Sequence, residues 1–302
     1  MMLQYDGSNE YQELLLEFKE YLLVEKGLST NTIESYTMDL KKFFLYLKVN
    51  QMSVLSLNWQ QGMEVLAYEQ KRLSKKSLKR YATTLRQFYR FLWIKKYIQE
   101  NPFENLELPK VPRTIPTYLT WEEVIRFFEV FDQKNPFELR DRAIFELMYA
   151  CGLRVSEVVN LKLKDIDFWN SEICVMGKGG QQRIVPLGEK THQTLKLYFD
   201  EARNRITKKT SEFVFLGKKG NRLDRRSVWR SITKYAKRAG LEKKISPHTL
   251  RHSFATHLIQ NQADIRVVQE LLGHKDITAT QIYTHITKTS LRNLHKQFHP
   301  RG

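Results

Sequence analysis

Apolar residues recur at helical spacing through most of the first hundred positions, which predicts a helical unit there. A first stripe ends near Gly27, and Ser29 or Thr30 can cap the helix that carries a second stripe. A weaker helix is expected over about Gln60–Arg72, and Ser74 can cap a fourth. The residues of the three clear stripes are Tyr11, Leu14, Leu15, Phe18, Tyr21 and Leu22; Ile33, Tyr36, Leu40, Phe43, Phe44 and Leu47; and Leu78, Tyr81, Ala82, Leu85, Phe88, Tyr89 and Leu92.

A cluster of prolines interrupts this helical pattern after the first hundred residues. Prolines at such density break helices and keep the chain extended. We therefore predict a linker over 109–117, which separates an N-terminal domain (1–108) from a C-terminal domain (118–302). The prolines are Pro109, Pro112 and Pro116.

The C-terminal domain begins with two further helical patterns, near Thr120–Phe131 and Glu138–Tyr149. Apolar residues then flank the glycine-rich turn 177–180, which predicts a β-hairpin. Those residues are Ile173, Val175, Ile184, Val185 and Leu187. Helical patterns continue to the end of the chain. The predicted fold is mainly α, with a mostly helical second domain that contains one small antiparallel β-sheet.

The charge of the chain favours a polyanionic partner such as nucleic acid, because 50 basic residues against 33 acidic ones give a net charge of +17. Residues 109–302 hold 35 basic and 20 acidic residues, whereas the segment Lys71–Lys96 holds ten basic residues and no acidic one. Basic residues in this segment that lie mostly off the apolar stripe are candidates for phosphate contacts, although a solvated helix face would have the same pattern. They are Lys75, Lys76, Lys79, Arg80, Arg86 and Arg90.

Other sequence features exclude several protein classes. No run approaches the ~18 consecutive apolar residues of a membrane span. The N-terminus is polar and carries Asp6 and Glu10, unlike a secretory signal, so we expect a cytoplasmic protein. Cys151 and Cys174 are too few for a disulfide scaffold, and we expect two buried thiols in a reducing compartment.

The first candidate site residues lie just after Pro247, which is well placed to start a helix. His248 and Arg251 then lie three residues apart on one face, near the positive end of the helix, which suits phosphate binding. A zinc site is the alternative, since His252 follows His248 by four positions. That alternative is disfavoured because Thr249 stands where a zinc-protease motif has its glutamate base, and no third ligand is apparent. We therefore expect no metal.

Four further residues are weak signals when each is taken alone. Arg154 ends an apolar helix with Glu157 one turn on, which is typical of a structural ion pair. Lys178 lies in the glycine-rich turn, where an exposed lysine is common. His274 follows a Leu-Leu-Gly sequence, and Tyr283, one of 14 tyrosines, stands nine residues later.

Taken together and in order, these residues resemble the active site of the tyrosine recombinase (phage integrase) family. That site has an Arg, a Lys, a His-x-x-Arg pair, a His or Trp, and a Tyr, and no member is missing here. The matches are Arg154, Lys178, His248, Arg251, His274 and Tyr283. The resemblance covers nearly the whole chain and implies an N-terminal core-binding (SAM-like) domain before the catalytic domain. Segments 266–274, 280–285 and 299–301 are similar to the bacterial Xer subfamily.

The resemblance implies phosphoryl transfer with Tyr283 as the nucleophile. A 3′-phosphotyrosyl link forms and a 5′-hydroxyl leaves, so neither ATP nor a metal cofactor is required. Arg154, Arg251 and His274 would neutralise the phosphate, and His248 would accept or orient the tyrosine proton. Lys178 would protonate the leaving oxygen. We expect Glu157 to hold the site together.

The resemblance also implies partners. The substrate would be a double-stranded DNA recombination site, bound by four protomers on two duplexes, with either a related Xer recombinase or copies of this chain. The apolar edge Leu291, Leu294 and Phe298 would dock into a neighbouring subunit; docking in the same chain is the alternative. The role would be resolution of chromosome dimers, with activation by the DNA translocase FtsK.

Three other functions fit parts of the sequence. An integrase or resolvase of a phage, plasmid or transposon would use the same chemistry. A non-catalytic DNA-binding regulator would share the charge and the helices, but it would not need the complete catalytic set. A metal-dependent nuclease would lose its activity in EDTA, whereas strand exchange without a metal would not.

Overall fold

The computed structural model describes residues 7–106, 117–177, 182–207, 209–273 and 297–301. Contacts divide the chain into two compact units, Met1–Thr114 and Ile115–Gly302, and each has its own apolar core. Most of the predicted linker lies outside the described residues. Within the described part, no helix is both long enough and apolar enough to span a lipid bilayer.

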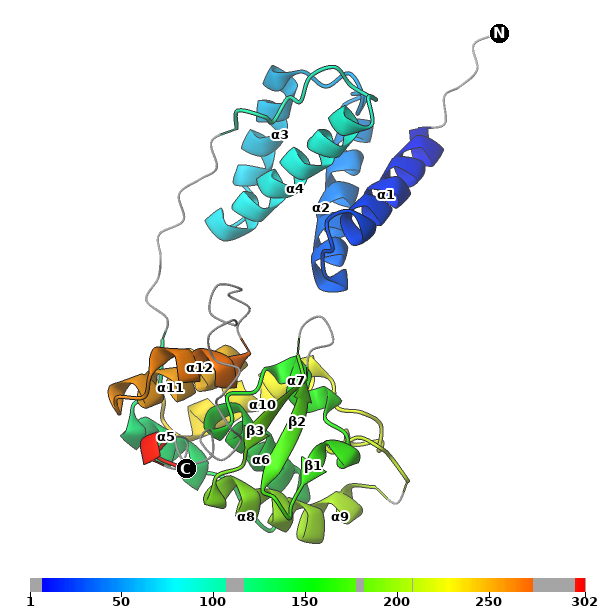
Figure 1. The fold of residues 1–302 in the computed structure, drawn as a ribbon. Helices are drawn as coiled ribbons and strands as arrows, with labels where there is room; N and C mark the ends of the chain where they lie inside the picture. The colour runs from blue at the N-terminus through cyan, green and yellow to red at the C-terminus, as the bar shows by residue number, and fades with distance from the viewer. Residues whose placement is uncertain (1–6, 107–116, 178–181, 208, 274–296, 302) are drawn as a thin grey trace. The chain divides into compact units, whose positions relative to one another are not determined.

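The described residues of the first unit form four helices, namely α1 (Gly7–Val24), α2 (Thr30–Val49), α3 (Trp59–Gln70) and α4 (Lys75–Ile94) (Figure 1). The apolar stripes of α1, α2 and α4 meet in one core, where the rings of Phe18 and Phe88 pack edge to face with centroids 5.2 Å apart. The Ser74 side chain caps α4, as predicted. Ser29 occupies the N-cap position of α2, but its hydroxyl lies 2.9 Å from that of Thr32 and makes no capping bond to the backbone.

The second unit is also mainly helical, with a small sheet between its helices, which confirms the predicted fold class. The helices of its first half are α5 (Trp121–Glu129), α6 (Pro136–Ala150), α7 (Val155–Asn160) and the 3₁₀ helix η1 (Leu163–Asp165). The strands are β1 (Ile166–Asp167), β2 (Glu172–Met176) and β3 (Gln182–Pro186). The remaining helices are α8 (Glu189–Tyr198), the π-helical turn η2 (Phe199–Arg203), α9 (Asn204–Ile206), α10 (Arg225–Arg238), α11 (Pro247–Gln260) and α12 (Ile265–Leu272).

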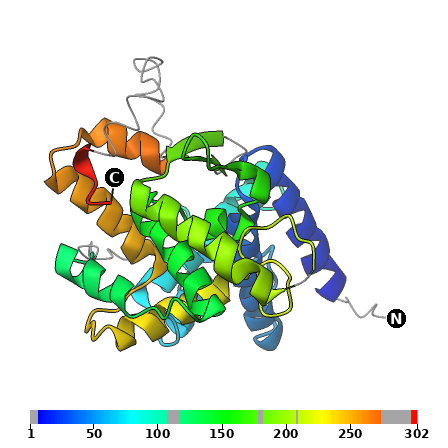
Figure 2. The same cartoon turned by 90° about the horizontal axis from the view of Figure 1, so that it is seen from below.

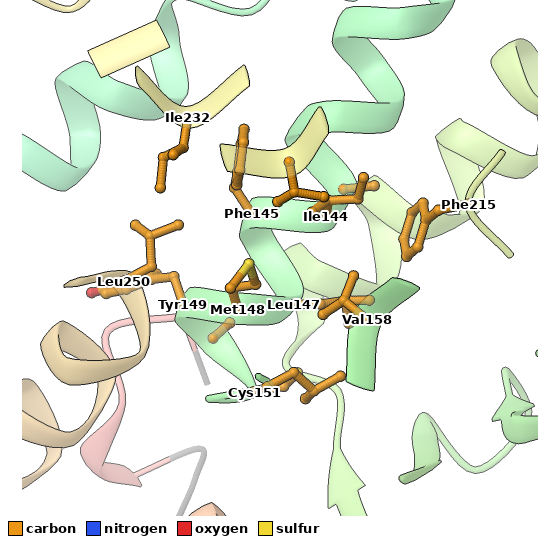
Figure 3. Close-up of a cluster of buried hydrophobic side chains, with 14 of the residues drawn as sticks. Ile144, Phe145, Leu147, Met148, Tyr149, Cys151, Val158, Phe215, Ile232 and Leu250 are labelled. Atoms are coloured by element: carbon orange, nitrogen blue, oxygen red, sulfur yellow. The ribbon is translucent and has the colours of Figure 1, made fainter. Parts of the chain in front are cut away.

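Helix α6 forms the centre of this unit and packs against α7, α8, α10 and α11. Its side chains are buried on nearly all faces, as expected of a helix surrounded by other elements. Figure 3 shows Phe145 and Met148 of α6 among Val158 of α7, Ile232 of α10 and Leu250 of α11. Burial of each such side chain contributes about 1.5–3 kcal/mol. The same packing fixes the first turns of α7 and α11, which carry candidate site residues.

The sheet is antiparallel in the order β1-β2-β3, and its β2–β3 pair confirms the predicted hairpin strands. Ile173 pairs with Val185, and both are buried. Cys151 is buried as expected, but Cys174 is only partly buried. The physical reason is strand alternation, because Ile173 and Val175 face the core and the residue between them faces the other side.

The described C-terminal residues pack against their own unit. Phe298 packs against an apolar cluster of α11 and α12, and the Asn261 side chain donates a 2.8 Å hydrogen bond to the Phe298 carbonyl. Figures 1 and 2 both show this end of the chain beside α11. Phe298 therefore packs within its own chain in this structure, which holds one protomer, and docking of this segment into a neighbouring subunit stays a prediction. Leu291 and Leu294 lie outside the described residues.

Arg301 completes this docking through a buried ion pair with Glu146 of α6. Its guanidinium also lies 4.3 Å from the centroid of the Phe128 ring. Burial raises the pKa of Glu146, and the charges of Arg301 and Arg142 oppose that rise. The charge of Arg301 thus compensates much of the negative charge of the buried Glu146 carboxylate.

We expect Arg301→Ala to destabilise the protein by about 3–5 kcal/mol, because it leaves a buried carboxylate without its main partner. Unfolding in denaturant at several pH values measures this loss. Since Glu146 already has a raised pKa in the folded protein, lowering the pH neutralises it and should shrink the deficit. Arg301→Ala combined with Glu146→Gln should recover part of the stability. A single variant as stable as the wild type would show that the pair contributes nothing.

Candidate active site

The chain turns sharply between α6 and α7, and this turn positions Arg154. Gly152 has a φ of +60°, and a Cβ there would lie 2.7 Å from the Phe254 ring, so only glycine fits. Arg154 follows as the N-cap residue of α7, and its backbone N–H donates a 2.8 Å hydrogen bond to Glu157. The turn therefore presents the Arg154 side chain at the start of a helix, with the Glu157 carboxylate beside it.

Glu157 receives hydrogen bonds from two guanidinium groups. Arg154 Nη1 donates to its Oε1 at 2.8 Å, and Arg183 donates to both carboxylate oxygens at 3.0 and 2.9 Å. Burial alone would raise the pKa of Glu157, but the bonds from Arg183 and the Arg154 backbone hold it below its ordinary value. Glu157 is therefore an ionised carboxylate that orients two arginines, as the sequence predicts for a residue that holds the site together.

Arg251 approaches the same carboxylate from the fifth position of α11, a helix that Ser246 caps. Its guanidinium donates to the backbone carbonyls of Gly152 and Leu272, and its Nη1 lies 3.9 Å from Glu157 Oε2. Burial lowers the pKa of Arg251, and the nearby charge of Arg154 lowers it further. The guanidinium is thus fixed in direction while its charge is only partly compensated.

Three guanidinium groups therefore face one carboxylate among the described residues of this cluster, an excess of two positive charges. A groove with a volume of about 510 Å³ lies beside it and is lined by Arg251, His248, His252 and Lys244. An anion that entered beside Arg251 would compensate the excess charge. The arrangement suits a phosphate group, which guanidinium groups bind through paired hydrogen bonds.

The structure thus brings together three of the six predicted catalytic residues. Arg154 and Arg251 meet at Glu157, and His248 lines the groove beside Arg251. The other three, Lys178, His274 and Tyr283, lie outside the described residues. Gly273, the residue before His274, is described, and its carbonyl lies 3.5 Å from Arg154 Nη2.

No metal-binding arrangement is found in the same part of the chain. The described residues contain no cluster of three or more His, Cys, Asp or Glu side chains that could hold a metal ion.

Comparison with known families decides what this cluster belongs to. Residues 117–290 match the phage integrase family, and residues 15–96 match the N-terminal SAM-like domain of phage integrases. The chain belongs to the phage integrase family. It is therefore a tyrosine recombinase, an enzyme that recombines DNA, as its sequence predicts.

Curated relatives cover the recombinase over almost its whole length. The tyrosine recombinase XerD of Staphylococcus haemolyticus is 40% identical over 294 residues, which cover 96% of this chain and 100% of that protein. XerD of Listeria innocua is 42% identical over 296 residues, with 96% and 99% covered. XerC of Oceanobacillus iheyensis is 41% identical over 300 residues, with 97% and 98% covered. Segments 266–274, 280–285 and 299–301 predict a recombinase closer to XerD than to XerC, and relatives of both names have similar identity.

A solved structure supports the same fold. The XerH site-specific recombinase, bound to a palindromic difH substrate in a post-cleavage complex, matches with a TM-score of 0.69 and 26% identity. The match covers 94% of this chain and 83% of that one. Because the chain belongs to a family of recombinases, the alternative of a non-catalytic DNA-binding regulator is no longer supported.

Sequence reasoning missed Arg183 as part of the recombinase cluster. Arg183 lies on β3, opposite the buried Val175 and two residues before the buried Val185. A charged residue at a core-facing position of a predicted strand is the signal that could have found it, because such a residue needs a buried partner. Here that partner is Glu157.

Part of the predicted DNA-binding face on α4 has partners inside the N-terminal unit. The segment 71–96 has no carboxylate of its own, but Arg80 forms a 2.9 Å ion pair with the buried Asp39 of α2. Arg86 donates hydrogen bonds to the carbonyls of Phe103 and Leu106. Arg80 therefore has a carboxylate partner on another helix, although its own segment contains no acidic residue. The residues that remain exposed and have no such assignment are Lys75, Lys76, Lys79 and Arg90.

Proposed function

We propose that this recombinase is a Xer-type enzyme that resolves chromosome dimers through a 3′-phosphotyrosyl intermediate on Tyr283. The observation that carries the proposal is the excess of positive charge around Glu157, because a metal-free phosphoryl transfer needs side-chain cations to stabilise the transferring phosphate. The relatives named XerD and XerC, at 40–42% identity, support the cellular role. Action on the chromosome would take place in the cytoplasm.

The proposed reaction exchanges one phosphodiester for another. The phenolic oxygen of Tyr283 forms a bond to phosphorus, the bond from phosphorus to the 5′-oxygen breaks, and a 3′-phosphotyrosyl ester remains. His248 takes the phenol proton, which a free tyrosine with a pKa of ~10 rarely loses at neutral pH. Lys178 gives a proton to the leaving 5′-oxygen. A 5′-hydroxyl from the second duplex then reverses these steps.

Arg154 and Arg251 would bind the two non-bridging oxygens of the scissile phosphate, and His274 would donate a further hydrogen bond. Their shared carboxylate, Glu157, supports this assignment because it fixes the directions of both arginines before DNA arrives. Preorganised cations need little rearrangement when charge develops on the phosphate. The orientation of Arg251 by two carbonyls supports the same conclusion.

We assign DNA-backbone contacts in the N-terminal unit to Lys75, Lys76, Lys79 and Arg90, which are exposed on α4. Arg80 and Arg86 would contribute mainly to the fold of that unit, since both have partners within it. By resemblance to the family, the active assembly would hold four protomers on two duplexes. The second recombinase could be a related Xer protein or a copy of this chain, with FtsK as the activator.

Covalent trapping on genomic DNA tests the proposed function. The full-length protein is incubated in EDTA with nicked genomic fragments, and the DNA that stays attached after denaturation is sequenced. We expect attachment through 3′-ends at one recurrent chromosomal site, with two half-sites about one helical turn apart. Attachment within a phage, plasmid or transposon would replace the chromosomal role with a mobile-element one. The absence of any adduct would refute the proposed function.

A further inference from the structure

Arg183 forms several hydrogen bonds in the candidate site, and no role has yet been assigned to it. It lies near the start of β3, five positions after the proposed general acid. Its Nη1 and Nη2 donate to the two oxygens of Glu157, which belongs to α7, at 3.0 and 2.9 Å. Its Nε donates to the carbonyl of Leu271, in the last turn of α12, at 3.0 Å. One side chain therefore joins a strand and two helices.

The geometry of this junction is specific to arginine. A planar guanidinium can place two parallel N–H groups on a carboxylate while its third nitrogen points elsewhere. The Arg183 side chain is 13% exposed, so these bonds are largely shielded from water. A lysine has a single nitrogen and cannot span the Glu157 carboxylate and the Leu271 carbonyl with the same directions.

Arg183 also lies against the chain just before a predicted catalytic histidine. A Cβ at Gly273 would come within 3.3 Å of Arg183 Cδ, and Gly273 has a left-handed φ of +64°. The Gly273 carbonyl is in turn 3.5 Å from Arg154 Nη2. These contacts join β3 to the end of α12, where Arg183 also bonds to the Leu271 carbonyl. The end of α12 is thus held between Arg183 and Arg154.

We propose that Arg183 is a positioning residue for strand cleavage, which sets Arg154 through Glu157 and sets the end of α12 through the Leu271 carbonyl. The inference rests on the proposed function and adds to it a residue that touches neither the phosphate nor the nucleophile. Arg183 thus acts on the residues that would bind the phosphate, and not on the proposed proton donor. Its loss should therefore slow the chemical step and leave DNA affinity nearly unchanged.

The expected effect follows from the loss of rate that a small displacement of a catalytic group causes. Movement of a catalytic group by about 1 Å can lower a rate by ~10²-fold. We expect Arg183→Ala to slow formation of the covalent complex by about 10- to 100-fold at saturating DNA. The apparent dissociation constant for DNA should stay within about threefold, because most affinity comes from phosphate contacts spread over both units. Arg183→Lys should restore only part of the rate.

The test uses the full-length protein and a nicked duplex that carries the site recovered by covalent trapping. Arg203→Ala is the matched control, since Arg203 also donates to backbone carbonyls, those of Ser211, Phe213 and Val214, and none of these three residues belongs to α7 or α12. A general loss of stability would appear in both variants, whereas slow cleavage should appear only in Arg183→Ala. Thermal unfolding of each variant is measured in parallel. Adduct formation by the wild type establishes the proposed function independently of either variant.

A second substrate distinguishes effects on the phosphate-binding arginines from effects on the proposed proton donor, Lys178. In a duplex whose scissile 5′-oxygen is replaced by sulfur, the leaving group departs without a proton donor. This substrate should restore cleavage by Lys178→Ala but not by Arg183→Ala, because Arg183 acts on the phosphate-binding side. Restoration of Arg183→Ala by sulfur would show that it acts through the lysine, which overturns the proposal.

Two further outcomes would also overturn it. One is a folded Arg183→Ala protein that cleaves at the wild-type rate. The other is a loss of rate that disappears when the fraction of bound DNA is taken into account. Should Arg183→Ala fail to fold, Arg183→Gln takes its place, since glutamine keeps part of the polar contact without the paired bonds to Glu157. In either variant the effect should be non-additive with that of Glu157→Gln, because both act through one ion pair.

Discussion

Tyr283→Phe is expected to bind the recombination site as tightly as the wild type and to form no covalent complex with it. The substitution keeps the aromatic ring and removes only the oxygen that would bond to phosphorus. Without that oxygen no phosphotyrosyl ester can form, and loss of a nucleophile has cost on the order of 10⁶-fold in other covalent enzymes. A nicked substrate that prevents religation makes the adduct accumulate and allows it to be resolved by denaturing electrophoresis.

Tyr118→Phe provides the matched control for this variant. It removes one phenolic hydroxyl from the same unit, where that hydroxyl accepts a 3.4 Å hydrogen bond from Gln260. This variant should form the adduct at close to the wild-type rate. A Tyr283→Phe protein that still becomes attached to DNA would mean that another side chain is the nucleophile.

The second-largest effect is expected for Arg251→Lys, which should lower the cleavage rate by about 10²- to 10³-fold, the usual cost of losing one donor to a developing anion. Lysine keeps the positive charge, so charge alone does not explain the loss. It cannot bond to the carbonyls of Gly152 and Leu272 and present two N–H groups to a phosphate at the same time. Single-turnover cleavage at saturating DNA measures the rate of this step.

Arg203→Lys controls for the general effect of replacing a partly buried arginine that binds carbonyls. It should cleave nearly as fast as the wild type. If Arg251→Lys also retained the wild-type rate, the directional role of the guanidinium would be wrong, and the charge excess beside Glu157 would have another purpose.

The helices were predictable because packing against a core makes apolar residues recur at regular intervals in the sequence. The stripes of α1, α2 and α4 repeat at helical spacing, since each helix buries one face. The hairpin was predictable because β-branched residues flank a glycine-rich turn. Short elements such as η1 and β1 leave no such mark, because two or three residues are too few to show a period.

The site was only partly predictable, for a different physical reason. The six candidate catalytic residues follow from resemblance to a family, and their order along the chain carries that information. Ion pairs between distant residues leave no local pattern, because tertiary packing alone brings the partners together. Arg183 and Glu157 are 26 positions apart, Arg80 and Asp39 are 41 apart, and Arg301 and Glu146 are 155 apart.

In the proposed reaction, one phenol becomes bonded to DNA beside the cluster of arginines. Digestion of the trapped wild-type complex with a protease and a nuclease, followed by mass spectrometry of the peptide that retains a nucleotide, tests it most directly. We expect a single modified peptide that carries its phosphodiester on Tyr283. A nucleotide attached to any other residue, or no attached nucleotide at all, would contradict it.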